Sequence, residues 1–199
     1  MSAVTSAPPA ASGSAPKGAP ANPVRKYYGK YRAIVFANID PLMIGRITVV
    51  CPDASFLTPT TWCMPCVPLA SPNAGMVALP AIGSGVWIEF EAGNPSKPIW
   101  VGCYWGLGAE VPVLSRIAPP AIPSITLQTT LKNGIVINDL AGPTGGVLIQ
   151  SLTGAMISVS DTGIIISNGK GAIINMTGTA INVIGAPFDV NGGALTVTV

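Results

Sequence analysis

The sequence predicts an all-β protein, and three observations support this prediction. Gly and Pro supply 23 and 20 of the 199 residues, a turn-rich composition that is unfavourable for long helices. Short runs rich in Val, Ile and Thr recur between Gly, Pro, Asn and Asp, which is typical of strands bounded by turns. We find no convincing amphipathic helix pattern in the chain.

The first 23 residues are almost all Ala, Pro, Ser and Gly, and Lys17 is their only charged residue. Such a segment buries too little apolar surface to order itself, so residues 1–23 are expected to form a disordered tail. The next segment, VRKYYGKYR at 24–32, is basic and aromatic and leads into the first expected strand.

Five strand-like runs follow between residues 31 and 106, each bounded by Gly, Pro, Asp or Asn. They are expected at 31–39, 43–51, 61–69, 85–90 and 97–105. Five short strands in so short a segment favour a small closed barrel of the OB type, with a domain over 24–106. Residues 107–124 contain four prolines and are predicted to form a linker.

From Gly134 to Val199 short β-branched runs recur, mostly 8 or 9 residues apart. A strand of about five residues and a tight turn use that length. The runs begin near 135, 147, 156, 164, 173, 181 and 195, with a less regular one around 188. Residues 117–199 carry five charged side chains, at Lys132, Asp139, Asp161, Lys170 and Asp189. So few charges cannot solvate a sheet that is apolar on both faces, so a self-associated stack of repeats over 125–199 is expected.

The composition argues against enzymatic chemistry. Without histidine the chain lacks the commonest general base and the usual imidazole metal ligand. Its four cysteines include one C-x-x-C, Cys63 to Cys66. In a strand the two thiols would point to opposite faces, which is unfavourable for binding one metal ion. We therefore expect the cysteines to be small apolar core residues rather than ligands of a zinc site or members of a redox site. We expect no catalytic residue, cofactor or metal.

The stretch LPAIGSGVWIEFEAGNPSKPIWVGCYWG at 79–106 resembles the OB domain of phage baseplate spike proteins. This family includes the baseplate assembly protein V group and the valine–glycine repeat spikes of type VI secretion. The matching positions are Pro80, Gly83, Val86 to Phe90, Gly93-Asn94-Pro95, Pro98 and Gly102; upstream, IGRITVVCPD at 44–53 is similar to the second strand of the family and Trp62 to its third-strand tryptophan.

The resemblance implies that the barrel is followed by an intertwined trimeric triple-stranded β-helix. In that arrangement the aliphatic side chains would fill the interior of a homotrimer, and the small polar side chains between them would face water. The expected trimer core consists of Ile135, Ile137, Val147, Ile149, Ile157, Val159, Ile164, Ile166, Ile181 and Val183; the expected water-facing set is Asn138, Gln150, Ser158, Ser160, Ser167, Asn175 and Asn182.

By the same resemblance, the chain is expected to be a structural, membrane-puncturing spike of a contractile injection machine that is driven by sheath contraction. The sequence has no lysozyme-like insert and no room for a fused hub domain, and its repeat is looser than a strict valine–glycine octad. A separate hub protein is therefore expected, together with contacts to the inner tube and baseplate. The expected docking residues for the hub are Arg25, Lys26, Tyr28, Lys30 and Arg32.

The final run alternates apolar and Thr residues to the last position, so a strand is expected to continue to the end of the chain. Spikes of this family end in a self-made apex or in a blunt end capped by a PAAR-repeat protein. A PAAR-type tip protein is therefore expected to bind Thr196, Val197, Thr198 and Val199.

Two other functions remain open from the sequence. An OB-fold nucleic-acid-binding module with an oligomerising β-repeat tail could use the basic and aromatic segment, although the net charge of +2 gives it little support. A glycan-binding fibre tip would need surface aromatics, and Phe188 is the only aromatic residue after Trp105. No apolar stretch of roughly 18 residues and no signal-peptide pattern are found. Cytoplasmic assembly into a phage tail or tail-like particle is therefore expected, with only transient contact with a target membrane.

Overall fold

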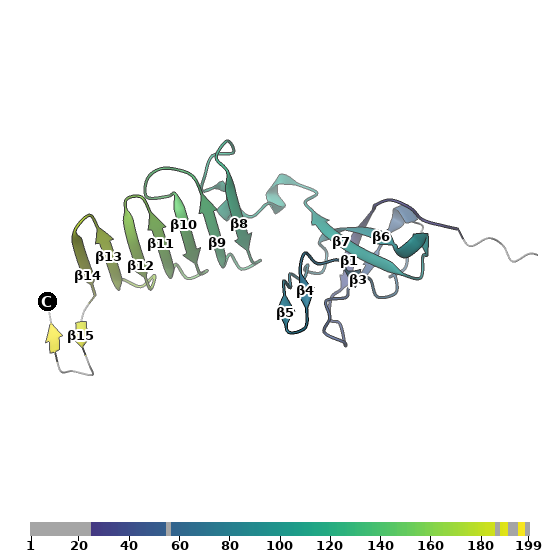
Figure 1. The fold of residues 1–199 in the computed structure, drawn as a ribbon, viewed down its shortest axis with the longest axis horizontal. Helices are drawn as coiled ribbons and strands as arrows, with labels where there is room; N and C mark the ends of the chain where they lie inside the picture. Colours follow the sequence, from purple (N-terminus) through teal and green to yellow (C-terminus); the bar gives the residue numbers. More distant parts are fainter. Residues whose placement is uncertain (1–24, 55–56, 186–187, 191–194, 198–199) are drawn as a thin grey trace, which may run out of the picture. The chain divides into compact units, whose positions relative to one another are not determined.

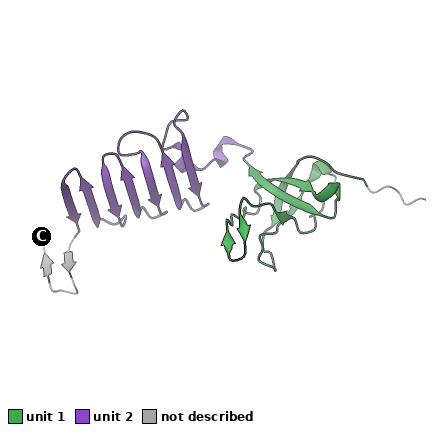
Figure 2. Ribbon diagram, in the orientation of Figure 1, with its two compact units in different colours: residues 1–104 green, residues 105–199 purple. Residues whose placement is uncertain are grey.

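The computed structural model describes residues 25–54, 57–185, 188–190 and 195–197. In these residues the regular structure consists of strands and short 3-10 turns, without α-helices. The chain divides between Tyr104 and Trp105 into two compact units (Figure 2). The first is an OB-type curled sheet and the second is built around a seven-stranded sheet, which confirms the predicted all-β fold class.

The first unit contains a five-stranded sheet in the order β2-β1-β6-β7-β3 (Figure 1). β3 pairs in parallel with β7, and the other pairs are antiparallel. These strands are β1 (Tyr31–Ala37), β2 (Thr48–Val50), β3 (Met64–Pro65), β6 (Gly85–Phe90) and β7 (Pro98–Tyr104). All five expected runs therefore contain a strand; β6 has the predicted bounds, and the other four strands are shorter than the predicted runs.

The core of this unit follows from the alternation of side chains along its strands. In β6 every second residue is buried, namely Val86, Ile88 and Phe90. Residues from β1, β2 and the neighbouring segments meet this face and complete one cluster: Ala33, Val35, Ile47, Val49, Cys51, Ala54, Cys63 and Trp100. A register shift between β6 and β7 places Trp87 opposite Gly102, whose φ of 150° favours glycine.

Two parts of this unit differ from the sequence prediction. The run predicted at 43–51 forms a strand only from Thr48, because residues before it belong to a loop organised by Asp40. An additional hairpin, β4 (Ala70–Ser71) and β5 (Ala74–Gly75), follows β3. Its turn contains Asn73 with a φ of 57°, a conformation that asparagine tolerates. Two 3-10 turns, η1 (Pro52–Ala54) and η2 (Glu91–Gly93), complete the unit.

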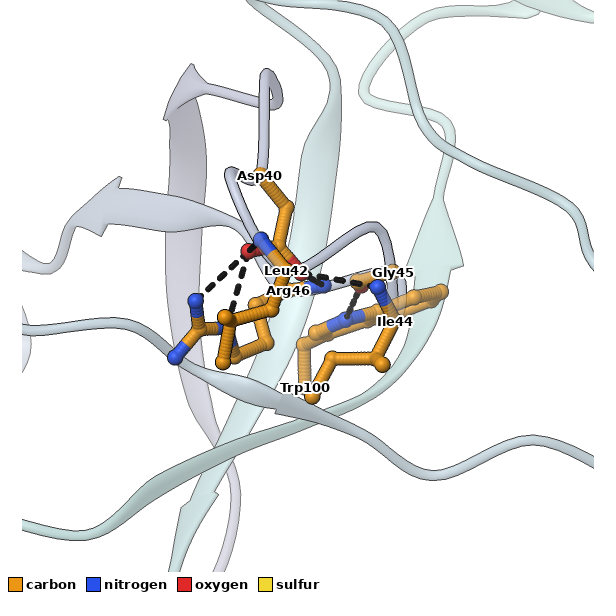
Figure 3. A network of polar contacts seen from close by, with 6 residues as sticks. All are labelled: Asp40, Leu42, Ile44, Gly45, Arg46 and Trp100. Atoms are coloured by element: carbon orange, nitrogen blue, oxygen red, sulfur yellow. Dashed lines mark hydrogen bonds and ion pairs between the residues drawn. The ribbon is translucent and has the colours of Figure 1, made fainter.

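Asp40 holds this loop through both carboxylate oxygens (Figure 3). The carboxylate accepts hydrogen bonds from the backbone N–H groups of Leu42, Ile44 and Arg46, at 3.0, 3.0 and 3.1 Å. It also pairs with the Arg46 guanidinium, whose Nη2 lies 2.6 Å away. The Asp40 side chain is only 4% exposed, so these partners replace the water that it loses. Trp100 donates its indole N–H to the Gly45 carbonyl at 3.0 Å and fixes the other side of the loop.

The second unit contains an antiparallel sheet in which each strand pairs with its neighbours in sequence (Figure 1). Its strands are β8 (Ser124–Gln128), β9 (Gly134–Asn138), β10 (Gly146–Gln150), β11 (Met156–Ser160), β12 (Gly163–Ser167), β13 (Ile173–Thr177) and β14 (Ala180–Ile184). The strands from β9 onward begin within one residue of the repeat positions found in the sequence. The sequence analysis did not identify β8.

The hydrogen-bond ladder of this sheet runs within one chain. The expected intertwined helix implied a ladder between chains, whereas the tight turns allow consecutive strands of the same chain to pair. A separate hairpin, β15 (Phe188–Val190) and β16 (Leu195–Val197), follows this sheet in sequence.

The segment predicted as a linker contains two 3-10 turns, η3 (Gly108–Glu110) and η4 (Val113–Arg116). Leu114 of η4 is buried, and its backbone N–H donates to Gln128 Oε1 at 2.9 Å. A Cβ atom at Gly134 would lie 2.6 Å from a Leu114 methyl carbon. The glycine that starts β9 therefore makes room for η4 on one face of the sheet.

The charge of Asp40 should make the stability of the first unit depend on pH. The Arg46 hydrogen bond, opposed by burial and assisted by the three backbone donors, holds the pKa of Asp40 well below its usual range. A carboxylate with a lowered pKa in the folded state stabilises the fold above its unfolded pKa of about 3.9, and this contribution is lost as the pH falls below that value. Asp40→Asn should therefore lower the thermal unfolding midpoint at pH 7.

The gap between wild type and Asp40→Asn should narrow as the pH is lowered from about 5 towards 2, measured by circular dichroism at each pH. Glu91→Gln is the control, because its ion pair with Lys97 is more than half exposed on both sides and contributes little. A gap that stays constant across this pH range would contradict the assigned role of the Asp40 charge.

Candidate functional site

One face of the C-terminal sheet carries two continuous rows of apolar side chains. The strand register aligns one residue of each strand in each row, and neighbouring members are direct cross-strand partners. From β8 to β14 the first row is Leu127, Ile135, Ile149, Ile157, Ile166, Ile174 and Val183; the second row is Ile125, Ile137, Val147, Val159, Ile164, Met176 and Ile181. We call this surface the apolar face.

All ten residues predicted as the trimer core lie on the apolar face. Ile125, Leu127, Ile174 and Met176 also belong to it, and the sequence analysis missed them. Their period-two alternation was visible in SITLQ and IINMT, but β8 precedes the regular repeat and Met is not β-branched.

The apolar face is largely uncovered in a single chain. Eleven of its fourteen members are exposed, from 39% at Ile174 to 70% at Ile181, and Val147, Ile164 and Met176 are half-buried. A continuous surface of this kind is unusual on a monomeric protein and marks a contact with another molecule.

On the opposite face of the sheet, two residues that were predicted to face water are buried instead. Asn138 and Ser158 are buried, at 5% and 8% exposure. The Asn138 amide donates to the Thr144 carbonyl at 3.1 Å and accepts from the Leu140 N–H at 2.9 Å, so it holds the turn after β9. Ser158 lies between Leu148 and Ile165, whose larger side chains flank it. Of the other five, Asn182 is exposed, while Gln150, Ser160, Ser167 and Asn175 are half-buried.

The basic and aromatic segment at 25–32 runs along β6 of the first unit. Tyr27 donates its backbone N–H to the Gly93 carbonyl at 3.0 Å and packs against Phe90. Of the five predicted docking residues, Arg25 lies 5.2 Å from the Tyr27 ring centroid. Lys26 Nζ donates to the Ala92 carbonyl at 3.3 Å, and Tyr28 is 70% exposed.

The remaining two docking candidates contact other groups on β6. Lys30 forms an ion pair with Glu89. Arg32 stacks 5.5 Å from the ring centroids of both Trp87 and Tyr104. The four cationic side chains thus all contact groups of the same chain, and the Tyr28 side chain is largely exposed.

A groove that the sequence analysis missed lies beside the β4–β5 hairpin. It encloses about 770 Å³, and its lining is mostly apolar. Met43 from the Asp40 loop is 90% exposed, and Leu69 and Val77 beside the hairpin are 61% and 86% exposed. The turn residues Ser71-Pro72-Asn73 were the available signal for the hairpin, but the apolar run before them was assigned to one long strand.

The four cysteines occupy two environments. Cys51 and Cys63 are buried in the core of the first unit, as predicted for small apolar residues. Burial raises the pKa of the Cys63 thiol to about 11. Cys66 and Cys103 are exposed, so the core prediction is wrong for these two. No three His, Cys, Asp or Glu side chains gather as metal ligands in the part of the chain that the structure describes.

The expected tip-binding residues lie at the limit of the described structure. Thr196 and Val197 belong to β16, which pairs with β15 through Asp189↔Thr196 and Phe188↔Val197. Thr198 and Val199, like the tail 1–23, lie outside the described residues.

An OB-type sheet followed by a repeat sheet with one uncovered apolar face defines a class of multimeric structural proteins. Two family models match the chain in this order. Residues 31–105 match the type VI secretion system and phage-baseplate injector OB domain, and residues 124–196 match the phage baseplate V C-terminal trimerisation domain. Together they cover most of the chain, which therefore belongs to the phage baseplate V family of structural injector components.

No curated protein sequence matches the chain. None of the described residues belongs to a helix long and apolar enough to cross a bilayer.

The cysteine environments predict a defined labelling pattern. A maleimide at pH 7 should modify Cys66 first, then Cys103, whose thiol pKa is raised by partial burial. Cys51 and Cys63 should react only after denaturation, because the reagent cannot reach them and burial raises both thiol pKa values. Mass spectrometry of digested samples gives the order, and Cys66→Ser should remove the fastest phase. Rapid labelling of Cys63 in the folded protein would contradict this packing.

Proposed function

We propose that this chain is the central spike of a contractile injection machine and that it acts as a homotrimer. The observation that carries this proposal is the apolar face, which lies within the match to a trimerisation domain. Three copies that turn this face towards a common axis would bury both rows in a shared core. Each isoleucine that goes from half exposed to buried contributes about 1 kcal/mol, and every row is present three times.

The spike works mechanically in this proposal. Contraction of a sheath drives the tube and the spike forward, and the narrow trimeric needle concentrates the force on the target envelope. The turns and half-buried polar groups outside the core carry few charges, so few charged groups need to be moved through a bilayer. The apolar face therefore acts through hydrophobic packing, without a catalytic step.

The OB unit supplies the attachment in this proposal. A separate hub protein binds its surface, and the inner tube and baseplate lie nearby. The docking residues remain Arg25, Lys26, Tyr28, Lys30 and Arg32, and the groove at Met43 and Val77 adds an apolar contact area. At the other end of the chain, a PAAR-repeat tip protein binds Thr196 to Val199. The particle is a phage tail or a related tail-like device.

The first test concerns the trimer core. Ile157→Asp should dissociate the trimer, because it places three carboxylates close to one axis inside an apolar core. Thr177→Asp is the matched control: Thr177 is exposed, and the register of β13 places it on the opposite face. Sedimentation equilibrium or native mass spectrometry gives the oligomeric state. A trimeric Ile157→Asp variant with an unchanged unfolding midpoint would show that the apolar face does not form the core.

The second test concerns the hub. Arg25→Glu combined with Lys26→Glu should reduce co-purification with the hub protein of the same particle, because it reverses two docking charges. The trimer should persist, since both residues lie in the first unit. Deletion of 1–23 serves as a control that leaves hub binding in place. If an isolated 125–199 fragment still bound the hub protein, the docking site would lie in the C-terminal sheet, and this result would contradict the proposed docking residues.

A further inference from the structure

The charged side chains of the C-terminal sheet are sorted between its two edges. Because consecutive strands are antiparallel neighbours, turns after β8, β10 and β12 lie at one edge and turns after β9, β11 and β13 at the other (Figure 1). Lys132 follows β8 and Lys170 follows β12, so both lysines lie at the first edge. Asp139 follows β9 and Asp161 follows β11, so both aspartates lie at the second. We call these the basic edge and the acidic edge.

These four residues are the only charged ones between 117 and 185, and all four are exposed. Within the described residues, every ion pair belongs to the first unit. The Asp161 carboxylate accepts hydrogen bonds from the Gly142 N–H, at 3.0 Å for each oxygen, and this contact leaves its charge unneutralised. A single chain thus separates its positive and negative side chains by the full width of the sheet.

Closure of a threefold ring determines which edges meet. In a cyclic trimer the contact between neighbours is heterologous, so one surface of a copy meets a different surface of the next copy. When three sheets turn their apolar faces to one axis, each basic edge therefore lies beside the acidic edge of the neighbouring copy. This step rests on the trimer proposed above.

We propose that Lys132 and Lys170 of each copy pair with Asp139 and Asp161 of the next copy, and that these contacts set the relative height of the three chains. The partner surface is thus a second copy of this chain.

The positions along the stack of strands support the pairing. Lys132 and Asp139 flank the two ends of β9, whereas Asp161 and Lys170 flank the two ends of β12. Under threefold symmetry the same strand of each copy lies at the same height. Each lysine is then within about one strand spacing, ~4.8 Å, of its partner aspartate along the axis.

The apolar face alone only weakly fixes the position of each copy along the threefold axis, because its two rows repeat nearly the same side chains at every strand. A copy displaced along the axis by two strands would still bury isoleucine against isoleucine. Such a displacement would, however, keep at most one of the two lysines within about one strand spacing of an aspartate and leave the other without a partner. Exposed ion pairs contribute little energy individually, but they discriminate between arrangements of similar packing energy.

The test is a charge exchange in the full chain. Lys132→Glu with Lys170→Glu gives each copy two acidic edges, so like charges meet at all three interfaces. This variant should lose trimer at low salt, with recovery as salt screens the repulsion. Adding Asp139→Lys and Asp161→Lys should restore the trimer, because every interface then pairs opposite charges again. Asp161→Asn reports separately on the hydrogen bond to Gly142, and Glu91→Lys with Lys97→Glu in the first unit is the control.

Cross-linking of the wild-type protein gives a readout that is independent of variant folding. A carbodiimide should join Lys132 to Asp139 between copies, which trimers mixed from ¹⁴N and ¹⁵N chains distinguish from links within a copy. A wild-type trimer that yields no such link, and keeps its stability in the double lysine variant, would overturn the edge pairing and leave the trimer standing. A monomeric wild-type chain would instead overturn the proposed function itself.

Discussion

A sheet that one chain cannot cover is the constraint on which the rest of the second unit depends. Strands with β-branched residues at alternate positions produce an apolar face two side chains wide, and a single-layer sheet has no second layer to pack against it. The opposite face can therefore be small and mixed in polarity. Tight turns keep the layer regular, and η4 covers only the end at which Gly134 makes room for it. In the proposed trimer, two further copies would complete the hydrophobic core that a single chain leaves exposed.

The first unit is stabilised in a different way. It buries its own cluster of apolar side chains within one curled sheet, and a nearly buried carboxylate organises the loop that precedes β2. Because Asp40 satisfies three backbone donors at once, the loop can hold Met43 in a left-handed conformation with its side chain in solvent. A fully satisfied polar network of this kind rigidifies the backbone that it holds.

Local sequence patterns predicted most strands and ten of the fourteen residues of the apolar face, because period-two alternation fixes the face of a side chain without knowledge of the tertiary structure. Burial on the opposite face was not predictable in this way. Asn138 is buried by the loop that it caps, and Ser158 by larger neighbours on adjacent strands. The loop at 43–46 was read as strand because its apolar residues gave no sign of the Asp40 contacts. Exposure of Cys66 and Cys103 likewise depends on packing between segments distant in sequence.

The meander order of β8 to β14 has a consequence for how the protein is made and how it can evolve. Every strand pairs with its neighbours in the chain, so loop-closure entropy is small and the contact order of this sheet is low. Each protomer sheet can thus form by zippering as the chain emerges from the ribosome, before other copies are encountered. Duplication or loss of one hairpin would change the length by about 10 Å, two strand spacings, and would return the chain to the same edge. The length of this sheet is thus open to stepwise genetic change without redesign of either end.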